Sequence, residues 1–395
     1  MEPGINFLDN LPPITGQEEH SFASYTIRNR LPHVIDMLIA ENNFSRDITI
    51  RLERLKENVQ DGKITFVPQH GQAARHWAKW IKPFIGQPWV ALPFYLAEAY
   101  FYRLVLEFSD FFSSEKDPFF ITKSRDIYEN KDRFPLILDS LNAFFQVESD
   151  SSTRLKYLLS LCLWGNKSDL SQLNWNSIRE NERSDEKTII NDDEMASTYL
   201  TAGVGRVDIV LDNSGLELFT DLVLAAQLVS LGIAKHVVLH AKKLPTFVSD
   251  ATKQDIRFLS DFLSKQNHQH TQNIAEQLDV LLSDGAISID DHEFWNAPLH
   301  FYEMPSELHR DLQKSDMIIF KGDANYRRIF GDKQLPVGLH LEDATQYMPS
   351  TSLAVRILKS EIMAGLGEME LSRIKNFDEQ WMVNGMYGII QMVKR

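Results

Sequence analysis

Before about residue 195, the apolar positions of the chain recur at helical spacing. The apolar side chains of residues 33–43 suit one face of a helix. Pro93 to Phe112 is strongly aromatic and apolar with charged residues at helical spacing, and Leu155 to Trp164 predicts another apolar helix. No segment in this part alternates well enough to predict a strand. The charge-dense stretch from Arg179 to Glu194 predicts a solvated loop. We therefore expect a helical first part.

After residue 195, short β-branched runs follow one another with a helix between the first two. Val207–Asp212 and His236–Ala241 predict two strands, and Leu216–Leu231 predicts the helix that joins them. Gly232 is expected to end that helix, because glycine accepts a left-handed backbone. Two later apolar runs, Asp316–Gly322 and Ser352–Lys359, predict further strands. Strands joined by a crossover helix are parallel, so the pattern predicts an α/β fold with a mostly parallel sheet.

Length and composition limit the class of protein. A chain of 395 residues allows two domains, which we place at 1–165 (helical) and 166–395 (α/β core). The formal net charge of −14 disfavours nucleic acid as the main partner. The single cysteine, Cys162, excludes a disulfide-rich secreted scaffold.

The sequence also predicts a cytoplasmic protein that does not enter a membrane. The N-terminus, MEPGINFLDNLPP, carries acids and prolines where a signal peptide needs a basic start and an apolar run. The most apolar later stretch, Leu222–Ala234, is too short to cross a bilayer. No obligate protein partner is evident from the sequence.

Polar residues follow the predicted strands, at the edge where open parallel sheets bind ligands. Asp212 and Asn213 end the first strand, and the loop after the second strand delivers Asp250. Three oxygen ligands without cysteine or histidine favour a hard divalent cation. The alternative is that each of these residues only caps a helix or forms a turn, with Asp250 capping a helix that begins near Ala251.

Cations and a glycine follow the later strands. Lys321-Gly322-Asp323 offers a cation, a flexible residue and an acid, which suits a phosphate group. Arg356 and Lys359 close the fourth run. The alternative is a surface turn with ordinary solvated charges.

Two other patterns in the sequence give weak or negative evidence about chemistry. His268 and His270 lie in a polar run without an obvious third metal ligand. No GxSxG motif supports a serine hydrolase, and no glycine-rich loop follows the first strand.

Four segments in this order carry a family resemblance: VDIVLDNSGLELFTDL, VVLHAKKLPTFVSD, FKGDANYR and RILK. Together they resemble the damage-control phosphatase family, formerly domain of unknown function 89, and within it subfamily III, the acidic residue methyltransferase group. YTIRNRLP, LAEAYFYR and DPFFITK in the first part are similar to the same subfamily. The resemblance implies a helical N-terminal part and a Rossmann-like α/β/α core.

The resemblance also implies roles for individual residues. Asp212, Asn213 and Asp250 are expected to bind the metal, and Glu217 to lie in the same pocket. The expected substrate-binding residues are Glu217, Lys321, Gly322, Asp323, Ala324, Asn325, Arg356 and Lys359, and the expected catalytic residues are Asp212, Asn213, Asp250, Lys321 and Asp323. Arg356 and Lys359 match the ends of the subfamily's RTxK motif, in which Ile357 here replaces the threonine.

The function that follows is hydrolysis of small phosphorylated metabolites with a divalent metal. Sugar phosphates such as fructose 1-phosphate or fructose 6-phosphate are the expected substrates. Manganese is the expected metal, with magnesium, cobalt or nickel as alternatives. The metal would neutralise charge and activate a water, while lysines hold the phosphate oxygens. The alternative is an S-adenosylmethionine-dependent protein carboxyl (glutamate) methyltransferase, since members of the subfamily have been so described.

Overall fold

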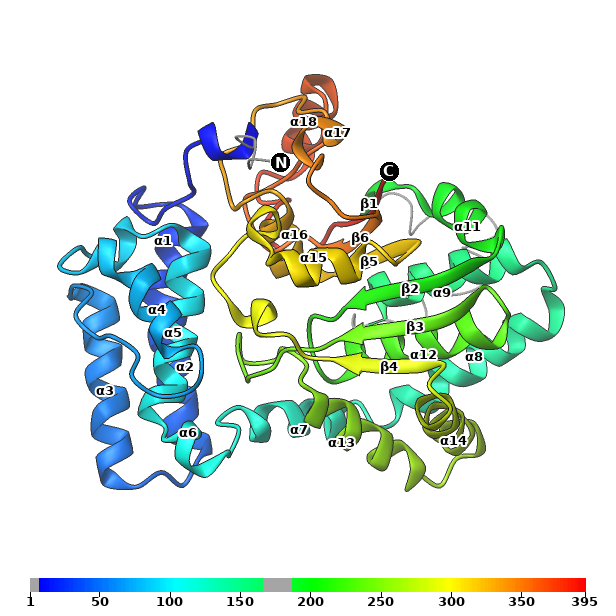
Figure 1. Cartoon of the computed structure of the whole chain (residues 1–395), viewed down its shortest axis with the longest axis horizontal. Helices are drawn as coiled ribbons and strands as arrows, with labels where there is room; N and C mark the ends of the chain where they lie inside the picture. Colours follow the sequence, from blue (N-terminus) through cyan, green and yellow to red (C-terminus); the bar gives the residue numbers. More distant parts are fainter. Residues whose placement is uncertain (1–6, 166–186) are drawn as a thin grey trace.

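Seven strands of the computed structural model, which describes residues 7–165 and 187–395, form one twisted sheet (Figure 1). Their spatial order is β1-β7-β6-β5-β2-β3-β4. Their bounds are β1 (Thr188–Asn191), β2 (Val204–Val210), β3 (Ala234–His240), β4 (Ile287–Asp290), β5 (Met317–Lys321), β6 (Thr351–Ile357) and β7 (Gly388–Val393).

The sheet is mostly parallel, as predicted. Strands β6, β5, β2, β3 and β4 all run in one direction, with Val210 of β2 paired to His240 of β3 and to Phe320 of β5. Strand β7 is antiparallel to β6 and parallel to β1, so β1, at the edge of the sheet, and β7 beside it run the other way. The carboxyl ends of β2, β3 and β4 point toward the N-terminal helices (Figure 1).

Helices make up most of the remaining structure. The α-helices are α1 (Phe22–Tyr25), α2 (Leu31–Glu41), α3 (Arg46–Asp61), α4 (Ala74–Ile81), α5 (Phe94–Phe108), α6 (Phe111–Ser114), α7 (Phe120–Glu129), α8 (Arg133–Val147), α9 (Ser151–Trp164), α11 (Asp193–Thr201), α12 (Leu216–Ser230), α13 (Lys253–Ser264), α14 (Gln269–Ser283), α15 (Ser306–Leu312), α16 (Gly322–Ile329), α17 (Leu341–Ala344) and α18 (Glu368–Phe377). One π-helix, η2 (Thr26–Arg30), joins α1 to α2, and short 3-10 helices lie at η1 (Phe7–Asn10), η3 (Lys82–Phe84), η4 (Trp89–Ala91), η7 (Glu293–Asn296) and η8 (Phe301–Glu303).

Two hydrophobic cores cover the two faces of the sheet. Because side chains alternate along a strand, neighbouring residues of β5 enter different cores: Ile318 and Phe320 face one, Met317 and Ile319 the other. The first core holds side chains of α2, α3, α5 and α16, and the second holds those of α8, α9, α12, α13 and α14. The protein therefore has the predicted α/β/α architecture.

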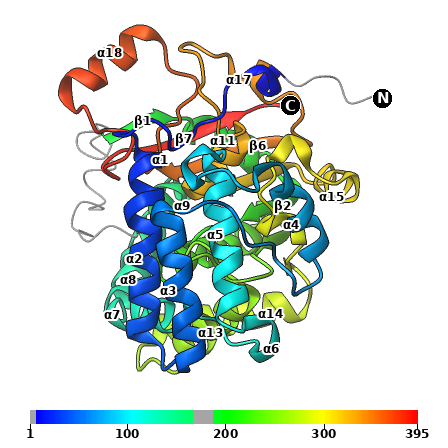
Figure 2. The same cartoon turned by 90° about the vertical axis from the view of Figure 1, so that its left-hand side faces the viewer.

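The N-terminal helices form a bundle against the first core. Figure 2 shows α2, α3 and α5 side by side. Helix α5 ends at Phe108, earlier than the sequence predicts, because Asp110 adopts a left-handed backbone with φ of 57°. The domain division at 165/166 stays a prediction.

Of the other local predictions, one was confirmed by the structure and one was wrong. Gly232 follows α12 with φ of +68°, as expected. The prediction of no strand before residue 195 was wrong, because Thr188–Asn191 pairs with β7. The part of the predicted loop up to residue 186 lies outside the described residues. No helix in the ranges 7–165 and 187–395 combines the length and apolar character needed to cross a membrane.

Candidate active site

The strand order identifies one place where a ligand site is expected. From β2 the chain passes to β3 and then β4 on one side, whereas β5 and β6 lie on the other side of β2. The order reverses between β2 and β5. In open α/β sheets, ligands bind beyond the carboxyl ends of the strands at such a switch point.

Asp212 and Gly322 occupy this switch point. Asp212 lies just after β2 and is 6% exposed, while Gly322 follows the last residue of β5 and opens α16. Gly322 has φ of +77°, and a Cβ built on it would lie 1.8 Å from Oδ2 of Asp212. The missing side chain of Gly322 therefore leaves the space that the Asp212 carboxylate fills.

Asn213, Glu217 and Asp250 lie around this carboxylate. The Asn213 amide nitrogen donates to Oδ2 of Asp212 at 3.0 Å and to Oε2 of Glu217 at 2.9 Å. The Asn213 carbonyl oxygen accepts a 2.6 Å hydrogen bond from Ser249. Backbone pairing between Asn213 and Asp250 holds the loop after β3 beside the turn after β2. The structure thus brings the three expected metal ligands together.

Asp250 is not a helix cap. Helix α13 begins at Lys253, and its cap is Thr252, which forms a capping box with Asp255. The helix-capping alternative for Asp250 was therefore wrong. Its carboxylate instead faces Lys242, whose Nζ lies 3.3 Å from Oδ2 of Asp250.

The charges here suit a bound cation. Burial, then the charges of Asp250 and Glu217, raise the pKa of Asp212 well above its ordinary value. Burial also raises the pKa of Asp250, although Lys242 opposes the shift. Within the described part of the chain, neither Oδ2 of Asp250 nor Nζ of Lys242 has a hydrogen-bond partner. Crowded, buried carboxylate and amide oxygens are the ligands that a hard divalent metal prefers, and Lys242 is the cation that balances Asp250 in this structure.

Lys321 lines the site, but its ammonium group contacts protein atoms. Nζ donates to the backbone carbonyl of Cys162 at 2.8 Å and lies 3.0 Å from Oδ1 of Asp221. Burial is the largest single influence and alone would lower the pKa of Lys321, but the charges of Asp221 and Glu217 and the contacts with Asp221 and Cys162 together raise it. Lys321 therefore ties β5 to α9 and α12 through a fully buried ion pair.

Asp323 and Lys359 form the opposite wall, and Arg356 lies behind them. The Asp323 carboxylate accepts from Nε of Arg356 at 2.7 Å and from the backbone N–H of Lys359 at 3.0 Å. Burial is the largest single influence and alone would raise the pKa of Asp323, but Arg356, Arg327 and the hydrogen bonds to the carboxylate together lower it. Arg356 also donates to the Ile362 and Ser360 carbonyls, so its guanidinium positions the loop that carries Lys359.

The residues of α16 that follow Asp323 do not line the cavity. The Asn325 amide donates to the backbone carbonyls of Leu211 and Lys321, and Ala324 packs against the first core. Arg327 bonds Glu98 and Asp332, which ties α16 to α5. Arg356, Ala324 and Asn325 are thus beside the site rather than on its surface.

The site is a small cavity of about 220 Å³. Its lining residues are Cys162, Leu163, Asp212, Asn213, Glu217, Lys321, Gly322, Asp323, Val355, Ile357, Lys359 and Gly385. A larger cleft of about 1120 Å³, lined by Trp77, Trp80, Phe112 and Lys242 among others, does not contain Asp212. We assign the chemistry to the smaller cavity, because the carboxylates of Asp212, Glu217 and Asp323 meet Gly322 there, although Asp250 is not among its lining residues.

Sequence reasoning missed two charged residues of this region. Lys242 lies two residues after the end of β3 and could have been found as a strand-end residue. Asp221 comes four residues after Glu217 on α12, so both lie on one helical face. The backbone carbonyl that Cys162 offers to Lys321 left no signal in the sequence.

Replacing Lys321 by alanine should destabilise the protein by about 3–5 kcal/mol, because Asp221 would remain buried without its partner. Urea unfolding measures this. Lys253→Ala removes a half-exposed pair with Asp291 and should cost no more than about 1 kcal/mol. If Lys321→Ala lost activity at unchanged stability, Lys321 would instead be a substrate-binding residue.

The chain thus combines a Rossmann-like sheet with a cavity at its switch point that is lined by acidic residues. Residues 26–373 match the model of the damage-control phosphatase ARMT1-like domain. The chain therefore belongs to this family of phosphatases.

Individual relatives agree with this assignment. The chain is 29% identical to damage-control phosphatase ARMT1 of Danio rerio, over 96% of this chain and 97% of the relative. It is 28% identical to the Homo sapiens protein of that name, with 96% and 97% covered. A solved DUF89 family protein from Pyrococcus horikoshii shares the fold, with a TM-score of 0.50, 12% identity, and 96% and 99% coverage.

Proposed function

We propose that this phosphatase uses a divalent metal to hydrolyse small sugar phosphates, such as fructose 1-phosphate or fructose 6-phosphate. The observation that carries the proposal is the convergence of Asp212, Asn213 and Asp250 on one buried, acid-crowded point at the topological switch. The family match supports the phosphatase class, and the substrate and metal are our inference.

Asp212, Asn213 and Asp250 would hold the metal through oxygen atoms. Manganese is the first choice, and magnesium, cobalt and nickel accept the same ligands. When bound, such an ion neutralises phosphate charge and lowers the pKa of a coordinated water.

The protein supplies the remaining contacts with the phosphate. Lys359 lines the cavity, and its side chain makes no hydrogen bond or ion pair with any other described residue. We infer that its ammonium holds a non-bridging phosphate oxygen. The N-terminus of α16 at Gly322 adds backbone N–H groups and a favourable helix dipole. Asp323, held by Arg356, keeps the Lys359 backbone in place.

A carboxylate oxygen of Glu217 is available to bind a substrate hydroxyl. Glu217 lines the cavity, and only its Oε2 accepts from Asn213. We infer that Glu217 orients a substrate hydroxyl or the attacking water. In a dry site, a polar group that lacks its partner costs binding energy, so analogues without the hydroxyl are rejected.

The size of the cavity favours a small substrate. Its volume of about 220 Å³ lies below the roughly 300–1,000 Å³ of drug-sized ligand sites. The overall charge of −14 also repels polyanions. Both features support sugar monophosphates over nucleotides, phosphopeptides and nucleic acid ends.

We expect sugar monophosphates to lead a metabolite panel ranked by kcat/KM. The chelator-stripped protein would be assayed for phosphate release with manganese and, as a control, without metal. A ranking led by phosphopeptides or nucleoside triphosphates would contradict the substrate class. Equal turnover with and without manganese would contradict the metal dependence.

The methyltransferase alternative is tested in the same samples. The described turn after β2 is not glycine-rich, and methyl transfer does not require a set of hard oxygen ligands. We therefore expect no transfer of label from S-adenosylmethionine to protein carboxyl groups. Labelling without phosphate release would reverse the assignment.

A further inference from the structure

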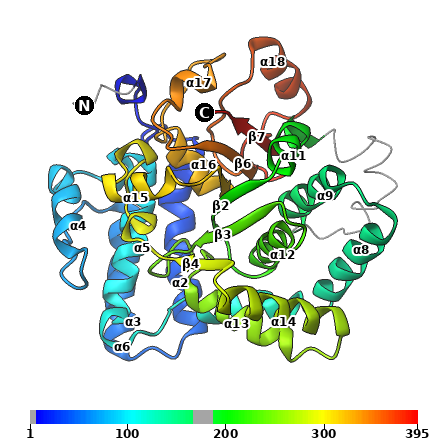
Figure 3. The same cartoon turned by 45° about the vertical axis from the view of Figure 1, so that its right-hand side comes forward.

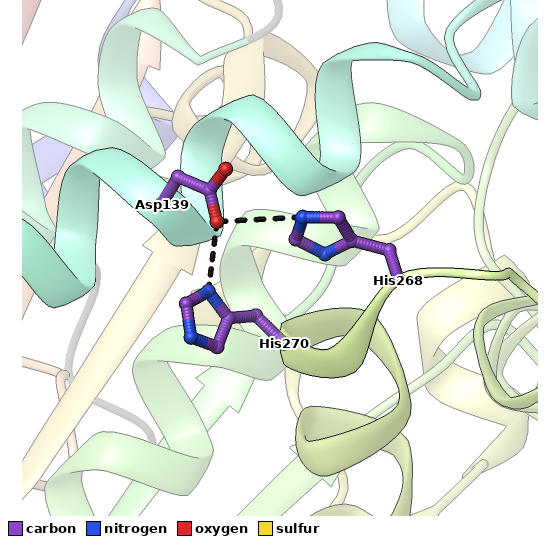
Figure 4. Close-up of side chains that lie close together, drawn as sticks. All are labelled: Asp139, His268 and His270. Atoms are coloured by element: carbon purple, nitrogen blue, oxygen red, sulfur yellow. Dashed lines mark hydrogen bonds and ion pairs between the residues drawn. The ribbon is translucent and has the colours of Figure 1, made fainter.

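A second group of metal-binding side chains lies outside the cavity described above. Oδ1 of Asp139 lies 2.7 Å from Nδ1 of His270 and 3.5 Å from Nε2 of His268 (Figure 4). One ligand atom from each residue lies within 4.8 Å of the other two. The sequence offered no third ligand to the two histidines, and the fold supplies Asp139 from a distant helix.

Two helices that pack against each other carry the three side chains of this cluster. Asp139 lies on α8, His268 caps α14 in an extended conformation, and His270 belongs to the first turn of α14. The two helices pack through Leu138, Leu141 and Ile274 of the second core, the buried residues behind the cluster. The three side chains are therefore held together by packed helices rather than by a loose loop.

Besides the hydrogen bond between His270 and Asp139, the arrangement of the three side chains suits a shared cation. A single carboxylate oxygen faces two imidazole rings, as the two dashed lines of Figure 4 show. Their exposed fractions, 50% for Asp139, 34% for His268 and 41% for His270, leave room for water as a further ligand. Two imidazole nitrogens and one carboxylate oxygen form a ligand set typical of zinc.

We propose that Asp139, His268 and His270 bind a zinc ion, with water as the fourth ligand. This site differs in chemistry from the oxygen-only site at Asp212, which favours a harder cation. It joins α8 to the hairpin of α13 and α14, on the side of the sheet away from the N-terminal helices (Figures 1 and 3). Zinc there fastens two helices that are far apart in the sequence.

The test is a zinc titration of the full, chelator-stripped chain, followed by calorimetry. To silence the other site, the titration uses the Asp212→Asn background as well as the wild type. His270→Ala and Asp139→Asn should each weaken zinc binding by more than about 100-fold, since loss of even an outer-shell partner costs about 10–100-fold. Cobalt(II) in the same site should give the visible spectrum of a four-coordinate ion, and His270→Ala should abolish it.

Matched variants separate metal binding from folding. His33→Ala and Asp279→Asn remove the same residue types from exposed or half-exposed positions outside the cluster and should keep wild-type zinc affinity. His270→Gln can keep a hydrogen bond to Asp139, so it should fold like the wild type without zinc while losing zinc affinity. Far-UV circular dichroism of each stripped variant checks the fold.

Two outcomes would overturn the proposal. One is zinc binding that survives both His270→Ala and Asp139→Asn. The other is zinc binding that disappears entirely with Asp212→Asn, which would place the ion in the phosphatase cavity. Manganese-supported phosphatase activity should be unchanged in His270→Gln, so the proposed function and this site can fail independently.

Discussion

Replacing Asp212 by asparagine should stabilise the metal-free protein while abolishing its response to manganese. The Asp212 carboxylate is buried beside Asp250 and Glu217, and this environment raises its pKa. The folded state therefore disfavours the ionised form at neutral pH. Asparagine keeps the shape and removes the charge, so unfolding in urea without metal should require a higher concentration than for the wild type.

The stability difference between Asp212→Asn and the wild type should change with pH in one direction. With its pKa raised on folding, the Asp212 carboxyl stabilises the fold most at low pH, and this contribution is lost as the pH rises through its folded pKa. The advantage of Asp212→Asn without metal should therefore grow as the pH rises above about 4, the ordinary range of an aspartate. A simple helix cap predicts the opposite, a loss of stability on replacement.

With manganese present, the order of the two proteins should reverse. A metal at about 100 times its dissociation constant stabilises the wild type by roughly 2.7 kcal/mol, and the variant should gain almost nothing. Its kcat/KM should fall about a thousandfold, since a bound metal supplies several kcal/mol of transition-state stabilisation. Asp291→Asn is the control and should keep activity, because Asp291 follows β4, which is separated from β2 by β3. Wild-type turnover by Asp212→Asn would refute the assignment of the metal site.

Much of this site could be predicted because it follows from local sequence and one topological rule. The apolar runs before Asp212 and Lys321 indicate buried strands, and parallel strands bring their carboxyl ends to one edge. Asp212, Asn213 and Asp250 were therefore predictable neighbours before any side-chain positions were known.

The missed strands lacked such a local signal. β1 and β4 are four residues each and lie among charged residues, so their patterns are too short to separate from loops. β7 runs antiparallel to β6, and its direction depends on the return path of the chain rather than on its own residues.

Ion pairs and hydrogen bonds between residues far apart in the sequence could not be predicted either. Arg356 reads as a surface charge in the sequence, yet it is fully buried because Asp323 and the carbonyls of Ser360 and Ile362 surround it. The partner of Lys321, Asp221, is one hundred positions earlier in the chain. A sequence shows which groups can pair, but the packed fold decides which do.

Replacing Gly322 by alanine should remove activity and lower stability together. The added Cβ would lie 1.8 Å from Oδ2, 2.2 Å from Cγ and 2.7 Å from Cβ of Asp212, so the carboxylate must move. The left-handed backbone, φ +77°, adds a cost of about 1–2 kcal/mol for any residue with a side chain. Displacing Asp212 should lower kcat/KM by about 100-fold or more, as small misplacements in active sites do.

Gly338→Ala is the matched control, because Gly338 has φ of +73° and a Cβ there would meet no atom within 4 Å. It should show the backbone cost alone and keep full activity. The excess loss of stability in Gly322→Ala then measures the clash with Asp212. In an Asp212→Gly background, which removes all three clashing atoms, Gly322→Ala should cost no more than Gly338→Ala. If the excess persisted there, Gly322 would be required for the α16 turn itself rather than for seating the carboxylate.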